Sequence, residues 1–412
     1  MASVASTADR IGWLRSVVAA HTPPPEQRLA PSAELPPIER ILGGEWVATP
    51  HGDAFVRDEW FAFGHEHGNL PLDSALAATP AALACLAAQP ATASRRFGFF
   101  DIETTGLGGG TGTYAFLAGL GTFEDAGFRL RQYFLASVPG ERAMLSLMRD
   151  DLATCDALVT YNGRAFDVPV VSTRLTLARL PDPYAGMAHF DLLHPVRRLY
   201  KHRMPACRLA DAERRLLGIE RFDDIPGALI PALYFAYVRA GRAAPLRAVF
   251  RHNADDVLSL VGLLARLTAL FECDEPPPDD AVALARWWEL AGQPERSIAL
   301  YRSALSWLEG DGDWAWAAGR QARLLRRAGA HDDAAALWRA LWAAGDAGAG
   351  LALAKHLEHR ARDYAAAAEV TRALLAGGVH ERQALRVRLE RIERKRARAA
   401  GYAGARQVRR TA

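Results

Sequence analysis

The sequence predicts an α/β domain, built on a mixed β-sheet flanked by helices, followed by an all-α domain of helical repeats. From Arg96, three strand-like runs follow one another, and strands and helices then alternate. Consecutive strands followed by such alternation are typical of a mixed sheet covered by helices. Beyond the acidic, Pro-rich stretch at 272–280, the remaining residues have helical spacing and a repeated pattern.

Residues 1–40 are rich in Pro and Ala, and we expect a flexible N-terminal arm. Residues 41–70 carry aromatic and β-branched residues between Gly and Pro, which indicates short strands. Residues 75–90 are compatible with a helix interrupted by Pro80. We therefore expect residues 41–95 to form a strand and helix extension that packs on the following domain.

The central domain is predicted over residues 96–271. Its expected strands are FGFFDI, TYAFLAGLGTF, FRLRQYFL, ALVTYNG and the HFDLL segment. Its expected helices cover residues 141–152, 168–180, 209–217, 231–240 and 245–270. Residues 272–280 are expected to be a linker to the next domain.

Residues 281–378 contain three related segments: GQPERSIAL at 292–300, GAHDDAAAL at 329–337 and RDYAAAAEV at 362–370. Small and large apolar residues alternate in them at helical spacing, as stacked helical hairpins require, and the pattern resembles tetratricopeptide repeats. Residues 379–412 are expected to form a basic helix or tail, since 381–412 contain eleven Lys or Arg and three Asp or Glu. The repeats could bind a protein partner.

The composition is that of a globular protein, with half of the residues hydrophobic and a quarter charged. No apolar stretch approaches the length that crosses a bilayer, so no membrane association is expected, and the N-terminus lacks the apolar core of a signal peptide. The four cysteines form no CxxC pair. These features favour the cytoplasm.

Two carboxylates stand at the end of the first expected strand of the central domain, at Asp101 and Glu103. Alternate residues of a strand point to the same side, so the two charges repel and lose solvation. A divalent cation relieves both costs, and hard oxygen ligands suit Mg²⁺ or Mn²⁺. Alone, this pair is weak evidence, because acids often end a strand.

Two further motifs also carry acids at the ends of expected elements. The run LVTYNGRAFD leaves a strand at Asn162, which could bind a substrate group, and reaches Asp167 at the start of a helix, where it could also be only a helix cap. In HNADD, His252 and Asp256 are four residues apart and share a helix face.

Together, the acids Asp101, Glu103, Asp167 and Asp256 could hold two metal ions about 4 Å apart, the arrangement used for in-line displacement at phosphorus. One ion would activate a water molecule and the other would stabilise the leaving 3′ oxygen. His252 could position or deprotonate the water.

The ordered motifs FDIETTG, YNGxxFD and HNxxD resemble those of the DEDD (DnaQ-like) 3′–5′ exonucleases, which have a ribonuclease H-like fold. The resemblance is closer to the YprB-like ribonuclease H-like proteins, which join such a domain to tetratricopeptide-like repeats. It implies a metal-dependent exonuclease with Asp101, Glu103, Asp167 and Asp256 as metal ligands. It also implies that the terminal nucleotide lies along Thr104, Thr105, Gly106 and Asn162.

The sequence departs from these motifs at one position. The His subtype places its histidine five residues before the last aspartate and the Tyr subtype its tyrosine four before. His252 stands at the second spacing, four residues before Asp256, which leaves its role as general base open.

The expected substrate is nucleic acid, and the sequence does not separate DNA from RNA. Basic residues in the middle of the chain could contact its phosphates without sequence specificity. They are Arg197, Arg198, Lys201, Arg203 and Arg208, and the basic tail could add further contacts.

Three alternatives compete with a nuclease. Residues 110–115 match the dinucleotide fingerprint GxGxxA, although that fingerprint should open a helix. The pairs His65/His67 and His356/His359 could suggest zinc, although surface positions suit them better. A non-catalytic scaffold is the third alternative, and intact acids at all three motifs argue against it.

Overall fold

The computed structural model describes residues 36–86, 96–106, 110–308, 312–377 and 382–411. The predicted N-terminal arm lies outside the described residues up to position 35. The chain divides into two compact units, Met1–Glu272 and Cys273–Ala412. No described helix is both long enough and apolar enough to span a membrane.

The first unit is built on a seven-stranded mixed sheet in the order β1-β2-β7-β6-β5-β8-β9. Strands β1, β2, β7, β6 and β5 pair antiparallel, and β8 and β9 continue the sheet parallel to β5. The bounds are β1 (Glu45–Thr49), β2 (Gly52–Phe61), β5 (Phe97–Thr104), β6 (Ala115–Glu124), β7 (Gly127–Phe134), β8 (Ala157–Thr160) and β9 (Ala188–Asp191). The mixed sheet predicted from the sequence is confirmed.

The N-terminal extension contributes more than a covering layer, because β1 and β2 extend the central sheet beyond β7. Two further short strands, β3 (Glu66–His67) and β4 (Leu70–Pro71), pair with each other. The expected helix over 75–90 is two elements, η1 (Leu72–Ala77) and α3 (Pro80–Leu86), because Pro80 begins the second one.

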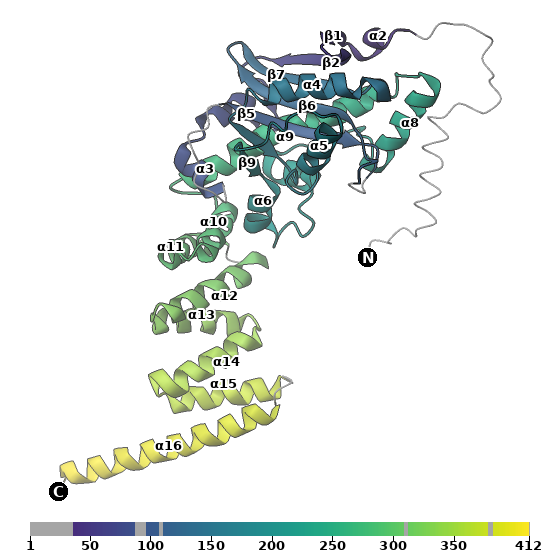
Figure 1. Cartoon of the computed structure of the whole chain (residues 1–412). Helices are drawn as coiled ribbons and strands as arrows, with labels where there is room; N and C mark the ends of the chain where they lie inside the picture. Colours follow the sequence, from purple (N-terminus) through teal and green to yellow (C-terminus); the bar gives the residue numbers. More distant parts are fainter. Residues whose placement is uncertain (1–35, 87–95, 107–109, 309–311, 378–381, 412) are drawn as a thin grey trace. The chain divides into compact units, whose positions relative to one another are not determined.

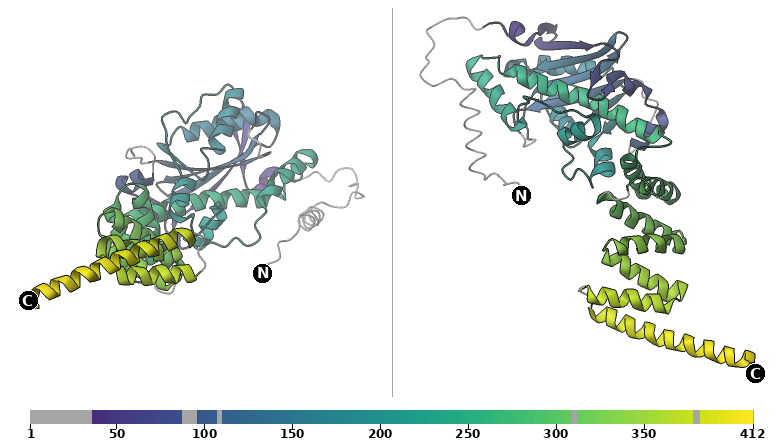
Figure 2. Two further views of the ribbon diagram at one scale, coloured as in Figure 1. Left: turned by 90° about the horizontal axis from the view of Figure 1, so that it is seen from below. Right: turned by 180° about the vertical axis from the view of Figure 1, so that it is seen from behind.

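Helices cover both faces of the sheet (Figures 1 and 2). The longest in this unit, α9 (Leu246–Glu272), packs against β5, β6 and β7, while α4 (Glu141–Leu152) and α5 (Asp167–Leu177) lie on the other face. The others are α2 (Ile38–Leu42), α6 (Leu193–Tyr200), α7 (Leu209–Ala212) and α8 (Ile230–Ala240), with the short η2 (Val138–Gly140), η3 (Glu213–Leu217) and η4 (Gly227–Leu229).

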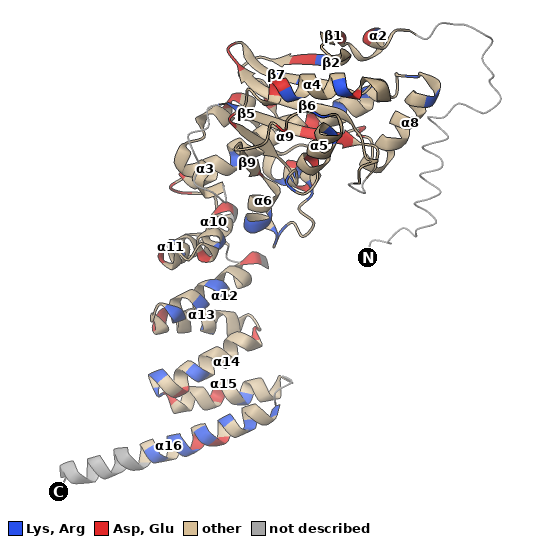
Figure 3. Ribbon diagram, viewed as in Figure 1, with Lys and Arg blue, Asp and Glu red and all other residues tan. Residues whose placement is uncertain are grey.

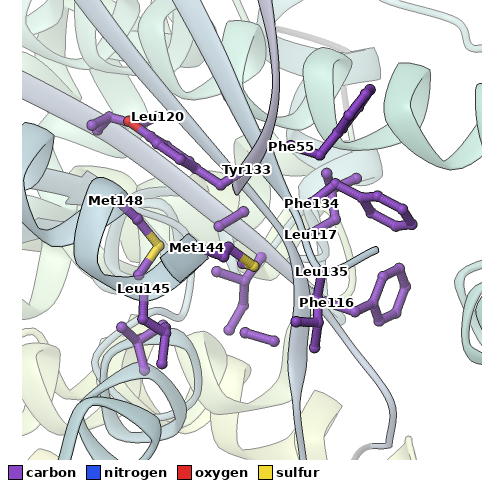
Figure 4. Close-up of a cluster of buried hydrophobic side chains, with 14 of the residues drawn as sticks. Phe55, Phe116, Leu117, Leu120, Tyr133, Phe134, Leu135, Met144, Leu145 and Met148 are labelled. Atoms are coloured by element: carbon purple, nitrogen blue, oxygen red, sulfur yellow. The ribbon is translucent and has the colours of Figure 1, made fainter. Parts of the chain in front are cut away.

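The core of this unit is formed by the apolar side chains of the sheet and of the helices packed on it (Figure 4). The rings of Phe116 and Tyr234 stack at a centroid distance of 4.1 Å, and Phe134 and Phe250 pack beside them. This packing fixes α8 and α9 against the sheet. It therefore fixes where the C-terminal ends of β5 and β8 lie relative to α9.

The second unit is entirely helical over its described residues, and each helix packs on the next. The helices are α10 (Pro278–Leu290), α11 (Pro294–Leu305), α12 (Gly312–Arg327), α13 (His331–Ala343), α14 (Ala347–His356), η5 (Leu357–Ala361), α15 (Tyr364–Ala376) and α16 (Arg382–Thr411). Helix α10 begins inside the stretch that the sequence predicted to be a linker, since Pro278 occupies its first position, where no amide donor is needed.

Each of the three related segments contains the start of a helix, and these helices are α11, α13 and α15. Each helix is preceded by a residue with left-handed backbone, Gly292, Gly329 or Arg362. Arg362 adopts at φ 55° the conformation that glycine supplies in the other two copies. The three segments are therefore equivalent in structure as well as in sequence.

Helix α16 carries Lys and Arg along its described side chains (Figure 3), and several of them bind within the unit. The carboxylate of Glu358, which is fully buried, accepts hydrogen bonds from Arg388, Arg391 and Lys395 at 2.6–2.9 Å. Although burial opposes ionisation, these cations hold the pKa of Glu358 at about 2. The sequence predicted a basic helix or tail here, but it did not predict that this segment would neutralise a buried acid of the same unit.

Replacing Glu358 by Gln should destabilise the full chain by about 2 kcal/mol at pH 7, because three cations lose their shared partner. The folded-state pKa lies below the ordinary value of 4.5, so this contribution is complete above about pH 4.5 and is lost as the pH falls toward about 2. Urea unfolding from pH 7 down to about pH 2 measures it, and Glu369→Gln, at an exposed acid of α15, is the control. An equal stability of Glu358→Gln and wild type at pH 7 would contradict this role.

Candidate active site

The site forms where the C-terminal end of β5 meets α9. Asp101 and Glu103 alternate along β5, and α9 presents His252 and Asp256 one helical turn apart. The Nε2 atom of His252 lies 3.8 Å from Glu103 Oε1 and 3.8 Å from Asp256 Oδ2. Segments almost 150 residues apart in the chain thus place three functional side chains together.

Among the described residues, Glu103, His252 and Asp256 are the group whose ligand atoms lie close enough to share a metal ion, all within 4.8 Å. Asp101 and Asp167 lie beside this group and interact electrostatically with Asp256. Their oxygens bind protein donors: Asp101 Oδ2 accepts from Asn253 at 2.9 Å and Asp167 Oδ1 from the Ile102 amide at 3.2 Å.

The buried acids have high pKa values. Burial raises the pKa of Glu103 to about 8, and Asp256 and Asp167 add to the effect against the opposing charge of His252. Burial also raises the pKa of Asp167 to about 7 and that of Asp101 well above its usual range, with the other carboxylates adding repulsion. Concentrated carboxylate charge of this kind is what a hard divalent cation neutralises.

Asn253 fixes the position of Asp101 and was given no role by the sequence analysis. It is fully buried and donates to both the carbonyl and the carboxylate of Asp101, while its own oxygen accepts from Gln132 Nε2 at 2.9 Å. Asp101, Gly119 and Gln132 stand opposite one another on β5, β6 and β7, so they share a face. A side chain at Gly119 would collide with Asn253, since a Cβ would lie 2.5 Å from its oxygen.

The sequence contains a pattern that could have predicted the position of Asn253 beside Gly119 and Gln132. Gly119 lies within the apolar run of β6, and Gln132 stands on the face of β7 that otherwise carries Phe128, Leu130 and Phe134. A glycine and a buried amide at such positions indicate the close approach of another polar group.

His252 is oriented by Asp224, whose Oδ1 lies 2.7 Å from His252 Nδ1. This contact leaves Nε2 facing Glu103 and Asp256. Burial favours the neutral ring, but the hydrogen bond to Asp224 and the charges of Asp256 and Glu103 together raise the pKa of His252 to about 9. Asp224 follows Arg221 in the loop between η3 and η4, which the sequence analysis did not assign to the site.

Arg221 was also missed, and it binds one of the predicted metal ligands. Its guanidinium donates to Asp256 Oδ1 and to the buried carboxylate of Glu213, and lies 3.4 Å from Asp224. The sequence predicted Asp256 to be a metal ligand. In the structure one oxygen is paired with Arg221, while the other faces His252.

The predicted nucleotide-contacting residues lie in the turns that follow β5 and β8. The hydroxyls of Thr104 and Thr105 close the turn, bonding the carbonyl of Gly106 and the amide of Tyr114. At Gly106, no atom of the described residues lies within 4 Å of the position that a Cβ would take. Asn162 adopts a left-handed backbone at φ 67°, and its amide donates to Asp191 Oδ1 at 2.7 Å.

Asp191, at the end of β9, holds this second turn in place. Its carboxylate is buried and also accepts from the amides of Arg164 and Leu193 at 3.1 and 3.2 Å. Tyr161 extends the contact by donating to the carbonyl of Cys207 at 2.7 Å, which places the segment carrying Arg208 next to the turn. Arg197, Lys201 and Arg208 are exposed, while Arg198 and Arg203 are half-buried.

The structure does not support the alternative site motifs. The predicted dinucleotide fingerprint leads into strand β6, not a helix, because Ala115 pairs with Thr104 of β5. His67 binds Ser259 of α9, at 2.9 Å. His356 is buried beside Asp332, contrary to its expected surface position, and the exposed ring of His359 lies 3.4 Å from Glu358.

Comparison with known proteins agrees with this geometry. Residues 98–268 match a family described as RNase_H superfamily, a range that begins at β5 and ends within α9. The chain is also 35% identical over 313 residues to YprB of Bacillus subtilis (strain 168), a protein described as uncharacterized, covering 72% of this chain and 74% of YprB.

The chain belongs to the YprB-like group of the ribonuclease H superfamily. Its mixed sheet with flanking helices is the fold that this family implies, and the helical second unit follows it. Membership supports a nuclease-type hydrolase acting on nucleic acid.

Replacing Asp224 by Asn should lower the pKa of His252 from about 9 toward its ordinary 6.5, because the carboxylate that stabilises the imidazolium is removed. Since the folded-state pKa is raised, the associated stability is present below about pH 6.5 and is lost as the pH rises through about 9. NMR titration of histidine-labelled, metal-free protein measures this, with His252→Gln for assignment. A His252 pKa unchanged by Asp224→Asn would refute the contact.

Proposed function

We propose that this protein is a divalent-metal-dependent nuclease, and more specifically a 3′–5′ exonuclease that hydrolyses phosphodiester bonds of DNA or RNA. The observation that carries the proposal is the convergence of Asp101, Glu103, Asp167 and Asp256 on one buried region beside an oriented histidine. The 3′–5′ direction comes from the resemblance to DEDD exonucleases.

The residues present fit hard divalent cations. Glu103 and Asp256 offer oxygens that face the same space, and Asp101 and Asp167 complete the acidic surroundings. These four residues would hold Mg²⁺ or Mn²⁺, two ions in the full site. When bound, the cations would supply Lewis-acid stabilisation of the charge that develops on phosphate oxygens.

The chain's own residues would prepare the attacking water. His252 Nε2 is free to face the water because Nδ1 is bound to Asp224. In its neutral form the ring could accept a proton at Nε2. Its high pKa is set partly by Glu103 and Asp256, so the ring would lose its proton more readily once cations neutralise these acids.

The substrate would lie along the turns after β5 and β8. The open space at Gly106 would admit the terminal nucleotide, with Thr104, Thr105 and Asn162 forming the adjacent backbone. Arg197, Lys201 and Arg208 would contact phosphates, because their side chains are exposed and Arg208 is adjacent to the Asn162 turn. The helical repeats would offer a surface to a protein partner.

The test is the incubation of full-length protein with end-labelled single- and double-stranded DNA and RNA, in Mn²⁺ or in EDTA. We expect release of mononucleotides from the 3′ end in Mn²⁺. Replacing Asp101 by Asn or Glu103 by Gln should slow the release by about 100-fold or more, since several kcal/mol of charge stabilisation are lost.

The matched control is Asp125→Asn, at an exposed acid in the turn between β6 and β7. It should hydrolyse at the wild-type rate. Hydrolysis that survives EDTA, or that persists in both site variants, would reject the proposal. Metal-dependent internal cleavage would retain the nuclease and reject the exonuclease.

A non-catalytic scaffold is the second candidate, and one observation favours it: Arg221 already neutralises part of Asp256. A scaffold would leave this pair intact and would bind nucleic acid without hydrolysing it. Equal binding in EDTA and Mn²⁺, with no cleavage of any of the four substrates, would support this candidate over the nuclease.

A further inference from the structure

Asp256, a candidate metal ligand, already has a cationic partner within the protein. The guanidinium of Arg221 donates to its Oδ1 atom, while its Oδ2 atom lies 3.8 Å from His252 Nε2. A divalent cation at Oδ1 and this guanidinium would bring like charges to the same atom, so the two exclude each other. A full metal site therefore requires Arg221 to move.

Arg221 is anchored at a second acid, which lies deeper in the protein. Its guanidinium also donates to Glu213 and lies 3.4 Å from Asp224. Glu213 is only 1% exposed, and its carboxylate also accepts from Ser259, which contacts His67 at 2.9 Å. Because a buried carboxylate that loses its cation is strongly destabilising, the contact with Glu213 is the fixed end of this arrangement.

The contact with Asp256 is the end that can be given up. The side chain of Asp256 is 16% exposed, so its carboxylate keeps some contact with water. Arg221 Nε is buried and has no hydrogen-bond partner among the described residues, which is unusual for a buried donor. A guanidinium that leaves Asp256 would keep Glu213 and Asp224 and would have this donor free for a new partner.

We propose that Arg221 is an internal counter-ion that occupies the Asp256 side of the metal site and is displaced when a divalent cation binds there. This inference rests on the proposed nuclease function, because it describes how the same site is regulated. Arg221 neutralises Asp256 while the site is unloaded, and it retains Glu213 and Asp224 when a cation takes its place. The arginine thereby sets the concentration of divalent cation that the site needs.

The test is a titration of full-length protein with Mn²⁺, in which electron paramagnetic resonance measures the free ion. Arg221→Gln removes the internal cation. Arg221→Gln combined with Glu213→Gln removes the cation together with its buried partner, so that the net charge is unchanged and no buried carboxylate is left unpaired. The control is Arg251→Gln, since Arg251 is an exposed arginine that donates to the carbonyl of Asp223 in the same loop.

We expect Arg221→Gln and the double variant to bind Mn²⁺ about 10- to 100-fold more tightly than the wild type, because a hydrogen bond to a charged group no longer has to be broken. The double variant is decisive, since a change in net charge alone would leave its affinity at the wild-type value. It also serves if Arg221→Gln fails to fold. Arg251→Gln should bind Mn²⁺ as the wild type does.

Equal Mn²⁺ affinity in the wild type and the double variant would overturn the inference. A gain confined to Arg221→Gln would also overturn it, because that gain would come from net charge.

Hydrolysis of end-labelled nucleic acid is measured separately on the same proteins. Metal-dependent hydrolysis by the wild type, with equal Mn²⁺ affinity in the double variant, would retain the proposed function and reject the role of Arg221. A double variant that binds Mn²⁺ beside a wild type that neither binds the ion nor hydrolyses would support the internal counter-ion and reject the nuclease.

Discussion

Several carboxylates lie close together at the end of β5, and their mutual repulsion and loss of solvation are the electrostatic cost that the rest of the structure has to offset. Asp167 is buried and Asp101 and Glu103 are half-buried, and each has a raised pKa because loss of solvation and neighbouring charge favour the protonated form. A fold gains nothing in stability from such a group. Such a group at one point of an otherwise well-packed sheet marks a candidate functional site.

Hydrogen bonds and opposite charges from neighbouring elements lower this electrostatic cost. Asn253 of α9 binds Asp101, and the loop after η3 supplies Arg221 to Asp256. A cation bound at this site would compete with Arg221 for Asp256.

The sequence predicted the sheet, the site acids and their order because each leaves a local signal: apolar runs that end in acids, and a helical stripe that carries His252 and Asp256. It failed for Arg221, Asp224 and Asn253, whose roles depend on which distant residues they meet. Short N-terminal strands were expected, but their addition to the central sheet was not, since pairing between β2 and β7 joins residues 67 to 79 positions apart. Likewise, nothing local distinguishes the arginines of α16 that bind Glu358 from those that face solvent.

The most direct test of the account is a titration of the full-length, metal-free protein with Mn²⁺, followed by electron paramagnetic resonance of the free ion. The account predicts saturable binding that weakens sharply in Glu103→Gln, because that side chain has carboxylate neighbours and no arginine partner among the described residues. Binding that is absent in the wild type, or that is the same in Glu103→Gln, would show that the acids are neutralised from within the protein and that the metal site does not exist.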